Sequence, residues 1–389
     1  MKLYDFQRTG VEFLKAAPRR YLADTMGLGK TPQACVAAAE LGSRNTLVVA
    51  PASALENWRR EWDDWGPAEI PTVMSFDILR RYGPTSGAYD LTIIDEAHYC
   101  KTPSAKRTKA AMLVARQSPR SWLLSGTPMP NHPGELYAPI AALWPEELER
   151  RGIKTYAQWF NRYCRWYATQ YGPKVYGVKN AHEIREWQAR AMLRRRVEDV
   201  ALDLPPLRVH LHRLSIPDTI VQGITGEETA RQRRLLGSFK APLIAKLIDG
   251  ELADGAYKKI VLGAYHKDTL ARFHKDLAKH HPTGFDGSTP VKDRQRILDA
   301  WTENEQSRIL IVQQTTAGVA LNMQAAPEIV LAEPDWVPDV NAQFIKRIHR
   351  IGQDKPCRAR LFSVPGTLDD SIMSGLAKKI AIQVELGLK

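Results

Sequence analysis

The chain has 389 residues, of which 44% are hydrophobic, and a formal net charge of +12 at pH 7. This length suffices for two lobes of roughly 150–200 residues each, and the positive charge favours a polyanionic partner. No apolar run reaches about 18 residues, which excludes an ordinary membrane-spanning helix, and we expect no membrane partner. The four cysteines, Cys35, Cys100, Cys164 and Cys357, lack the spacing of a metal site, as is typical of a reducing compartment.

Short apolar runs alternate with stretches of helical composition along the chain. The runs that we predict as strands are Thr46–Ala50, Leu91–Asp95, Ser121–Ser125, Ile260–Tyr265, Arg308–Val312 and Glu328–Leu331. This alternation is typical of parallel sheets covered by helices on both faces. The pattern occurs once before Asn131 and again after about Tyr257, which predicts two α/β lobes.

The chain between these two patterns has a different composition. Pro133 to Leu204 is predicted to be helical, and it is rich in aromatic residues, including Trp159, Phe160, Tyr163, Trp166 and Tyr167. Arg208 to Ser215 alternates between apolar and polar residues, which predicts a strand. We therefore expect a first lobe at 1–132, a helical protrusion at 133–206, a connector at 207–240 and a second lobe at 241–389.

The segment Ala23–Thr31 has the composition of a phosphate-binding loop. Its glycines let backbone N–H groups turn toward phosphate oxygens, and the helix that follows adds a favourable dipole. Lys30 can reach the β- and γ-phosphates of a nucleotide, and the Thr31 hydroxyl can bind Mg²⁺. Because Asp24 stands where the general pattern has glycine, an ordinary strand-to-helix turn is the alternative for this segment alone.

An acidic pair and an arginine pair add to this prediction. Asp95 and Glu96 end a buried strand downstream of the loop, where one carboxylate can hold Mg²⁺ and the other can polarise the attacking water. Arg347 and Arg350 are three residues apart, so we expect both on one face of a helix. Such a pair suits arginine fingers delivered by a second domain.

These motifs together resemble the superfamily 2 helicase-fold ATPases of the Swi/Snf type, which are double-stranded-DNA translocases. Glu333–Pro338 and Gly366–Asp369 are similar to segments of the compact HARP-like annealing helicases. The matching motifs, which span nearly the whole chain, are Leu3–Val11, Asp24–Thr31, Val49–Trp58, Ser75–Leu79, Asp95–His98, Leu124–Asn131, Tyr265–Lys267, Asp286–Thr289, Thr316–Gly318 and Gln343–Gln353. Ala320 stands where the family normally has glycine.

The resemblance implies two tandem RecA-like lobes with a helical protrusion on the first, ATP and Mg²⁺ as cofactors, and duplex or branched DNA as the partner. It implies catalysis by Lys30, Glu96, Arg347 and Arg350, and Mg²⁺ binding by Thr31 and Asp95. The nucleotide-binding residues that it implies are Gln7, Asp24, Met26, Gly27, Leu28, Gly29, Lys30, Thr31 and Gln353. The implied DNA contacts, mainly to the backbone and tolerant of sequence, are Ser53, Asn57, Ser75, His266, Lys267, Ser288, Thr289 and Thr316.

Two further patterns have more than one interpretation. Trp58, Trp62 and Trp65 recur on one helix face, which favours core packing. The run Arg194–Arg196 is either a solvated surface or a contact to phosphates.

We therefore expect an intracellular, cytoplasmic DNA-dependent ATPase that translocates on or remodels DNA, associated with the nucleoid if the protein is prokaryotic or viral. Because the first motif begins two residues after Met1, we expect no N-terminal targeting segment. The alternatives are a strand-separating helicase on DNA or RNA, and an ATP-gated DNA-binding motor subunit of a larger complex. Gln353 argues against the RNA branch, which usually has arginine there.

Overall fold

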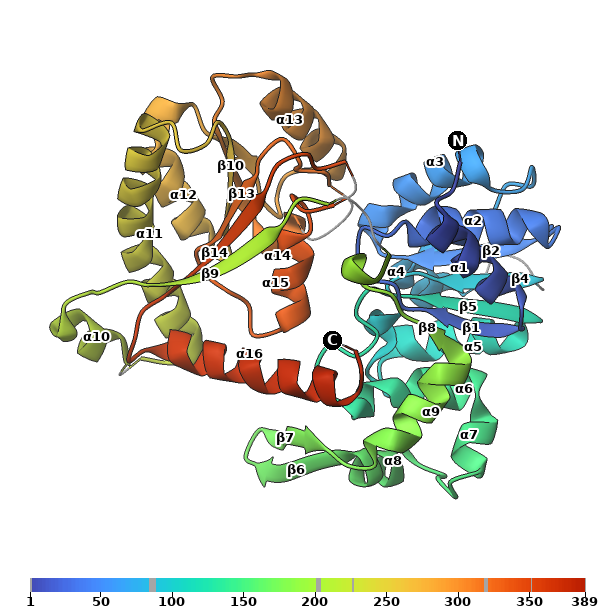
Figure 1. The fold of residues 1–389 in the computed structure, drawn as a ribbon. Helices are drawn as coiled ribbons and strands as arrows, with labels where there is room; N and C mark the ends of the chain where they lie inside the picture. The colour runs from blue at the N-terminus through green and yellow to red at the C-terminus, as the bar shows by residue number, and fades with distance from the viewer. Residues whose placement is uncertain are drawn as a thin grey trace. The chain divides into compact units, whose positions relative to one another are not determined.

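The computed structural model describes residues 2–83, 89–200, 204–225, 227–317, 321–350 and 352–388. The chain divides into two compact units (Figure 1). The first unit comprises Met1–Leu202 together with Lys378–Lys389, and the second comprises Asp203–Ala377. Each unit contains a parallel sheet, and the predicted α/β architecture of two RecA-like lobes is confirmed.

The sheet of the first unit has the strand order β3-β2-β4-β5-β1-β8, and all neighbours in it are parallel. Its strands are β1 (Arg19–Leu22), β2 (Thr46–Ala50), β3 (Thr72–Ser75), β4 (Leu91–Ile94), β5 (Arg120–Leu124) and β8 (Met192–Leu193). Strands β2 and β4 are buried along their whole length, because helices cover both faces of the sheet. The carboxyl ends of all six strands lie at one edge, where ligands bind in open parallel sheets.

The helices of the first unit lie in two layers on opposite faces of this sheet, with α1, α2 and α3 on one face and α4, α5 and α6 on the other (Figure 1). Alternate strand residues point to the same face of the sheet, and on the face toward α4, α5 and α6 they include Leu47, Val49 and Ile94. These residues form a core with the three helices. The helices that precede α7 are α1 (Asp5–Lys15), α2 (Lys30–Glu40), α3 (Leu55–Trp65), α4 (Phe76–Tyr82), α5 (Lys106–Gln117) and α6 (Tyr137–Leu143). The short 3₁₀ turns among them are η1 (Ala52–Ala54), η2 (Ala97–Cys100) and η3 (Pro133–Leu136).

The expectation that residues 133–206 are helical is only partly right. Helices α7 (Pro145–Glu149), α8 (Tyr156–Tyr163) and α9 (Ala181–Ala191) are present, with the 3₁₀ turn η4 (Val197–Val200). Between α8 and α9, however, strands β6 (Cys164–Thr169) and β7 (Gly172–Val178) form an antiparallel hairpin. Strand β8, which follows α9, joins the main sheet beside β1.

The sheet of the second unit has the strand order β11-β12-β10-β13-β14-β9, again with parallel neighbours. Its strands are β9 (Leu207–Arg213), β10 (Ile260–Ala264), β11 (Thr283–Phe285), β12 (Ile309–Gln313), β13 (Glu328–Leu331) and β14 (Cys357–Ser363). The six strands predicted from apolar runs in the two lobes are confirmed, each with its ends within one residue of the structure.

Two helices cover each face of the second sheet (Figure 1). Ile260, Leu262 and Ile311 pack against α11 and α12, whereas Val261 and Leu310 pack against α13 and α15. The helices of this unit are α10 (Asp218–Thr225), α11 (Thr229–Ala253), α12 (Lys267–Asp276), α13 (Val291–Glu303), α14 (Gln314–Ala317) and α15 (Pro338–Ile345), with the 3₁₀ turn η5 (Ala278–His280).

The segment 207–240, expected to be a connector, belongs to the second unit. Its strand β9 pairs with β14 over seven residues, from Leu207 to Arg213, and this ladder makes it an edge strand of the sheet. The last helix, α16 (Leu368–Glu385), contributes its first residues to the second unit and its last residues to the first. Ile382, Leu386 and Leu388 are buried in the core of the first unit.

The part of the chain that the structure describes contains no helix long and apolar enough to cross a membrane. Within the same residues, no group of three or more His, Cys, Asp and Glu side chains is arranged to hold a metal ion.

Candidate functional site

The predicted phosphate loop joins β1 to α2. Gly27 and Gly29 have φ values of +89° and +67°, a region that favours glycine, and α2 begins at Lys30. The Lys30 ammonium donates to the carbonyl oxygens of Asp24, at 2.8 Å, and Thr25, at 3.4 Å. Burial lowers the pKa of Lys30, and the carboxylates of Glu96 and Asp24 oppose this shift. The ammonium therefore points back into the loop, where phosphate oxygens bind in such loops.

Asp24 is held inside the protein by Arg195. The Asp24 side chain is fully buried, and its Oδ2 lies 2.5 Å from Nη2 of Arg195, whose Nε also donates to Oδ1 at 3.0 Å. Arg195 further donates to the Phe6 carbonyl and to Gln33 of α2. The structure thus gives Asp24 a role in fixing the loop to α1 and α2, while direct contact with a nucleotide stays a prediction.

Gln7 packs directly against the loop. Its side chain is 6% exposed, its Nε2 donates to the Leu28 carbonyl at 3.3 Å, and its Oε1 accepts from the Tyr4 N–H at 3.0 Å. Leu28 itself is buried, and Met26 lies against Gly126, where a Cβ would meet the Met26 Cγ at 2.8 Å. Gln7 is therefore hydrogen-bonded to the phosphate loop, and its contact with adenine stays a prediction.

The acidic pair follows β4 at the same edge of the sheet. The Asp95 carboxylate accepts from Trp58 Nε1 and from the Glu96 N–H, each at 2.8 Å. Burial and the neighbouring Glu96 charge raise the pKa of Asp95 to about 6. Trp58 is buried as expected, but its indole also orients the carboxylate, a role that helix periodicity does not reveal.

Glu96 and the end of β5 are joined by His98. Glu96 has a left-handed backbone (φ +48°), and its Oε2 lies 3.2 Å from His98 Nδ1. The same ring nitrogen lies 3.0 Å from Ser125 Oγ and 3.3 Å from Thr127 Oγ1. His98 therefore bridges the acidic pair and the Leu124–Asn131 motif.

The residues present suit ATP and Mg²⁺. Within the loop, the Thr25 hydroxyl oxygen is buried and has no hydrogen-bond partner among the described residues. The Glu96 charge helps to raise the pKa of the adjacent Asp95 carboxyl, and a divalent cation relieves such repulsion. Thr31, in the first turn of α2, and Asp95 are the residues that would hold Mg²⁺.

The arginine pair does not lie on a helix, so this expectation is wrong. Helix α15 ends at Ile345, and Lys346 to Arg350 continue as turns. The Arg347 carbonyl accepts from the Met323 N–H at 3.0 Å, and the Arg350 carbonyl accepts from Gln324 Nε2 at 3.0 Å. Beyond Ile345 the backbone hydrogen bonds are those of single turns, as the Arg347 and Ile348 N–H groups donate to the Phe344 and Ile345 carbonyls. Both arginines are half-buried in the second unit, whereas Lys30 and Glu96 belong to the first.

Gln353 joins the turn that contains Arg347 and Arg350 to the neighbouring loop at Gln324. Its side chain is 5% exposed, its Nε2 donates to the Ile348 and Gln324 carbonyls, and its Oε1 accepts from the Asp354 and Lys355 N–H groups. These contacts give Gln353 a positioning role near Arg350, and nucleotide binding by it stays a prediction. Ile351, within this motif, lies outside the described residues.

Three loops with predicted DNA contacts meet at Gln313, the last residue of β12. We call this group the Gln313 cluster, and its members are Tyr265, His266, Lys267, Asp286, Gly287, Ser288, Thr289, Gln313 and Thr316. Gln313 Oε1 accepts from the Gly287 N–H at 2.8 Å and Thr316 Oγ1 at 3.3 Å, and its Nε2 donates to the Tyr265 carbonyl at 2.9 Å. The sequence suggested these loops separately but not the glutamine that joins them. Gly318 and Ala320 lie outside the described residues.

Charged groups of this cluster are paired with one another. The exposed Lys267 ammonium lies 3.0 Å from Asp286 Oδ2 and donates to Ser288 Oγ at 3.2 Å. Hydrogen bonds from Ser288 and Lys267 lower the pKa of Asp286 to about 2. His266 Nδ1 lies 2.6 Å from the buried Glu333, which also accepts from the Tyr265 and His266 N–H groups. The cluster thus has a fixed base and an exposed, polar surface.

The predicted DNA contacts of the first unit follow β2 and β3. Ser53 lies in η1 and Asn57 on α3, both half-buried beside the carboxyl end of β2. Ser75 is buried, and its hydroxyl accepts from the Ile78 N–H at 3.2 Å as the N-cap of α4. The structure therefore gives Ser75 a capping role, and its contact with DNA stays a prediction.

The basic run Arg194–Arg196 binds protein groups rather than forming a solvated face. Arg194 donates to the Ala23, Gly126 and Leu388 carbonyls. Arg195 pairs with Asp24, and only Arg196, paired with Asp199 at 2.9 Å, is exposed. The signal that could have indicated this pair is Asp24 in the loop. A charged side chain that is buried needs a partner of opposite charge, and Arg195 is that partner.

Comparisons with known proteins agree with this arrangement. Residues 73–219 match the model of the SNF2-related domain, and residues 242–352 match the helicase conserved C-terminal domain. The chain is 28% identical to SWI/SNF-related matrix-associated actin-dependent regulator of chromatin subfamily A-like protein 1 of Xenopus tropicalis, over 99% of this chain and 45% of the relative. The chain therefore carries an SNF2-related domain followed by a helicase conserved C-terminal domain.

Other relatives of this SNF2-related chain are longer proteins too. It is 28% identical to DNA annealing helicase and endonuclease ZRANB3 of Mus musculus, over 98% of this chain and 40% of the relative. The chain therefore spans 45% and 40% of the length of these two relatives. A solved structure, the Sulfolobus solfataricus SWI2/SNF2 ATPase core in complex with dsDNA, aligns with 100% of this chain and 94% of its own at 20% identity, with a TM-score of 0.47.

Proposed function

We propose that this SNF2-related chain is a DNA-dependent ATPase that translocates on, or remodels, duplex or branched DNA. One observation carries the proposal. Lys30 and the Asp95–Glu96 pair form a candidate phosphate and metal site in one unit, while the Gln313 cluster joins hydroxyl and basic groups on three loops of the other. The similarity to ZRANB3, which is named as a DNA annealing helicase and endonuclease, supports the choice of branched DNA.

The first unit binds and orients the nucleotide. Lys30 leaves the carbonyls of Asp24 and Thr25 and meets the β- and γ-phosphates, and the loop N–H groups bind the remaining oxygens. Thr31 and Asp95 hold Mg²⁺, which supplies Lewis-acid stabilisation of the phosphate charge when it is bound. Trp58 keeps the Asp95 carboxylate in one orientation for this contact.

Glu96 positions the attacking water, and the arginines complete the site. His98 Nδ1 lies 3.2 Å from Glu96 Oε2, so the ring limits the positions that the carboxylate can take beside the water. Arg347 and Arg350, supplied by the second unit, neutralise the charge that develops on the transferring phosphoryl group. Hydrolysis therefore requires both units to act together.

The nucleotide state is passed to the Leu124–Asn131 motif through short contacts. His98 connects Glu96 to Ser125 and Thr127, and Met26 packs on Gly126 in the same motif. In the second unit, Lys267, Ser288 and Thr316 face the phosphate backbone, so binding tolerates any sequence. Changes at the nucleotide loop then alter the affinity of one unit for the DNA relative to that of the other unit.

A screen of nucleic-acid ligands tests this function. ATP hydrolysis should be stimulated by duplex and forked DNA more than by single-stranded DNA or RNA, and a triplex-displacement assay should detect movement along the duplex. Stimulation by RNA alone, or strand separation of a duplex, would instead favour a strand-separating helicase. Stimulated hydrolysis without triplex displacement would indicate a motor subunit that does not move alone.

A further inference from the structure

The β6–β7 hairpin extends from α8 and has exposed side chains on both faces (Figure 1). Trp166 pairs across the strands with Val175 and Ala168 with Pro173, on the face toward α8. On the opposite face, Tyr167 pairs with Lys174. A hairpin with two exposed faces buries little apolar surface, so stability of the fold alone does not account for its aromatic residues.

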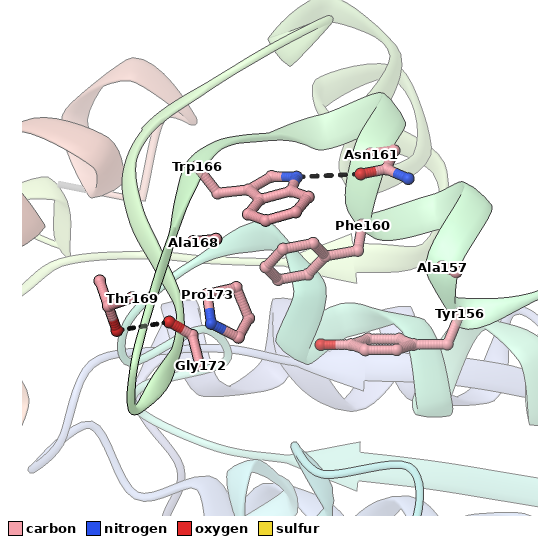
Figure 2. Close-up of a pocket in the computed structure, with 9 residues that line it drawn as sticks. All are labelled: Tyr156, Ala157, Phe160, Asn161, Trp166, Ala168, Thr169, Gly172 and Pro173. Carbon is pink, nitrogen blue, oxygen red and sulfur yellow. Dashed lines mark hydrogen bonds between the residues drawn. The ribbon is translucent and has the colours of Figure 1, made fainter.

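The face toward α8 borders a cleft of about 350 Å³ (Figure 2). Its lining is mostly aromatic and small, and consists of Tyr156, Ala157, Phe160, Asn161, Trp166, Ala168, Thr169, Gly172 and Pro173. The Phe160 and Trp166 rings lie 5.9 Å apart, and the Tyr156 and Phe160 rings 5.7 Å apart. Trp166 is 38% exposed and Tyr156 is 37% exposed, so flat ring surface is open to solvent.

The cleft is held in shape by polar contacts at its ends. Trp166 Nε1 donates to Asn161 Oδ1 at 2.9 Å, and Thr169 Oγ1 donates to the Gly172 carbonyl at 2.7 Å (Figure 2). At the base of the hairpin, Glu183 accepts from Arg162 at 2.6 Å and from the Tyr163 hydroxyl at 2.6 Å. The ring orientations are therefore set before any ligand arrives.

The opposite face combines aromatic and basic groups. The Tyr167 and Tyr176 rings lie 6.0 Å apart, and they are 48% and 55% exposed. Arg165 lies across Gly177 of the neighbouring strand, where a Cβ would be 3.4 Å from its Cδ, and Lys174 is exposed beside Tyr167. From residue 162 to residue 182 the sequence contains four Arg or Lys residues and no Asp or Glu.

We propose that the β6–β7 hairpin binds single-stranded DNA, with a base inserted against Trp166 in the cleft and phosphates farther along the strand on Arg165 and Lys174 of the opposite face. The positive charge complements a phosphate backbone, and it disfavours a basic protein partner. Stacking on aromatic rings requires base faces that a duplex hides, so the ligand is an unpaired strand. This inference rests on the proposed function, because the single-stranded arm of branched DNA supplies such a segment.

Binding of a fluorescent oligo(dT) of roughly 20 nucleotides, longer than typical single-strand sites, tests the inference by anisotropy without ATP. Trp166→Ala should weaken binding about 10-fold, and Trp166→Phe should recover most of it, since loss of one base–aromatic stack has effects of this order. Lys174→Glu should weaken binding and reduce its salt dependence. Phe239→Ala, an exposed aromatic of α11 in the second unit, serves as the matched control and should change nothing.

The same variants distinguish this inference from the proposed function. Blunt-duplex-stimulated ATP hydrolysis should stay at the wild-type level in all of them, whereas a wild-type protein that duplex DNA does not stimulate would contradict the proposed function. The hairpin inference is overturned if Trp166→Ala and Lys174→Glu bind oligo(dT) like the wild type while hydrolysis is intact. Tyr167→Ala removes only an exposed ring, so a matching loss of affinity in it supports the inference even if Trp166→Ala unfolds.

Discussion

The phosphate loop of the first unit and the Gln313 cluster of the second use similar polar residues in opposite ways. In the loop, Asp24 is fully buried and Gln7 is 6% exposed, and both bind other protein groups. In the cluster, Lys267 is 58% exposed and Ser288 is exposed, above a buried base formed by Glu333. The first region is a buried network of polar contacts, and the second is an open polar surface.

This difference predicts how each region responds to substitution. A buried group with several partners cannot be replaced without leaving those partners unsatisfied, so the loss is large. An exposed charge contacts a flexible polyanion through one of many phosphates, so its loss is graded.

Lys30→Ala and Glu96→Gln should each abolish ATP hydrolysis, measured by phosphate release. Glu96→Gln should still bind ATP, because Glu96 acts on the water, whereas Lys30 contacts phosphate in the ground state. Glu56→Gln, an exposed glutamate of α3, is the control. Normal turnover in Glu96→Gln would contradict the assignment.

Arg350→Ala should lower kcat by about 10³-fold or more, as expected for an arginine finger. Nucleotide affinity should change little, since the phosphate loop lies in the other unit. Lys355→Ala, an exposed neighbour, should keep kcat. A variant that loses affinity but keeps kcat would show that Arg350 binds the ground state instead.

Asp24→Asn should destabilise the first unit by about 3–5 kcal/mol, because Arg195 then lacks its buried partner. Asp199→Asn breaks the exposed pair with Arg196 and should change the free energy of unfolding by less than about 1 kcal/mol. Denaturant unfolding of both variants measures the difference. A stable Asp24→Asn protein with weakened ATP binding would restore the direct nucleotide role.

Trp58→Phe should lower the activity or the apparent Mg²⁺ affinity about 10-fold, since it removes the indole N–H from Asp95 but keeps the ring. Trp62→Phe is a closely matched control, because Trp62 is equally buried on the same helix and donates to the Glu69 carbonyl instead. Equal effects in the two variants would mean that packing of the helix, and not orientation of the carboxylate, is what matters.

Lys267→Ala should weaken DNA binding several-fold, equally for unrelated duplex sequences, and should reduce the log–log salt slope by about 0.9. Lys275→Ala, at the other end of α12, is the control. If Lys267→Ala alters sequence preference instead, the cluster reads bases and the proposed translocation on any sequence loses support.

The parallel sheets were predictable because their strands are short, mostly apolar runs, such as Thr46–Ala50 and Glu328–Leu331. The β6–β7 hairpin was not, because Trp159, Phe160 and Tyr163 do form a helix, and the aromatic run continues through Trp166 into the strand. Composition alone does not show where the helical periodicity of α8 ends and the strand alternation of β6 begins.

The site was predictable as a set of motifs but not as a set of contacts. The sequence placed Lys30, Asp95 and Glu96 correctly at the strand ends of one sheet. It did not predict that Arg195, some 170 residues away, pairs with Asp24, or that the arginine turn replaces a helix beyond Ile345. These features depend on tertiary partners that local patterns do not encode.

Gln313 has a mechanical consequence. It ends β12, which lies between β10 and β11, so the loops after β10 and β11 each lie one strand spacing, about 4.8 Å, from the end of β12 and cannot separate from it without breaking the amide contacts of Gln313. An advance along a duplex of one base pair, roughly 3.4 Å, is therefore too large to come from stretching between these loops. On the proposed function, the cluster has to step as a rigid gripping surface, with all three loops releasing and rebinding the strand in unison.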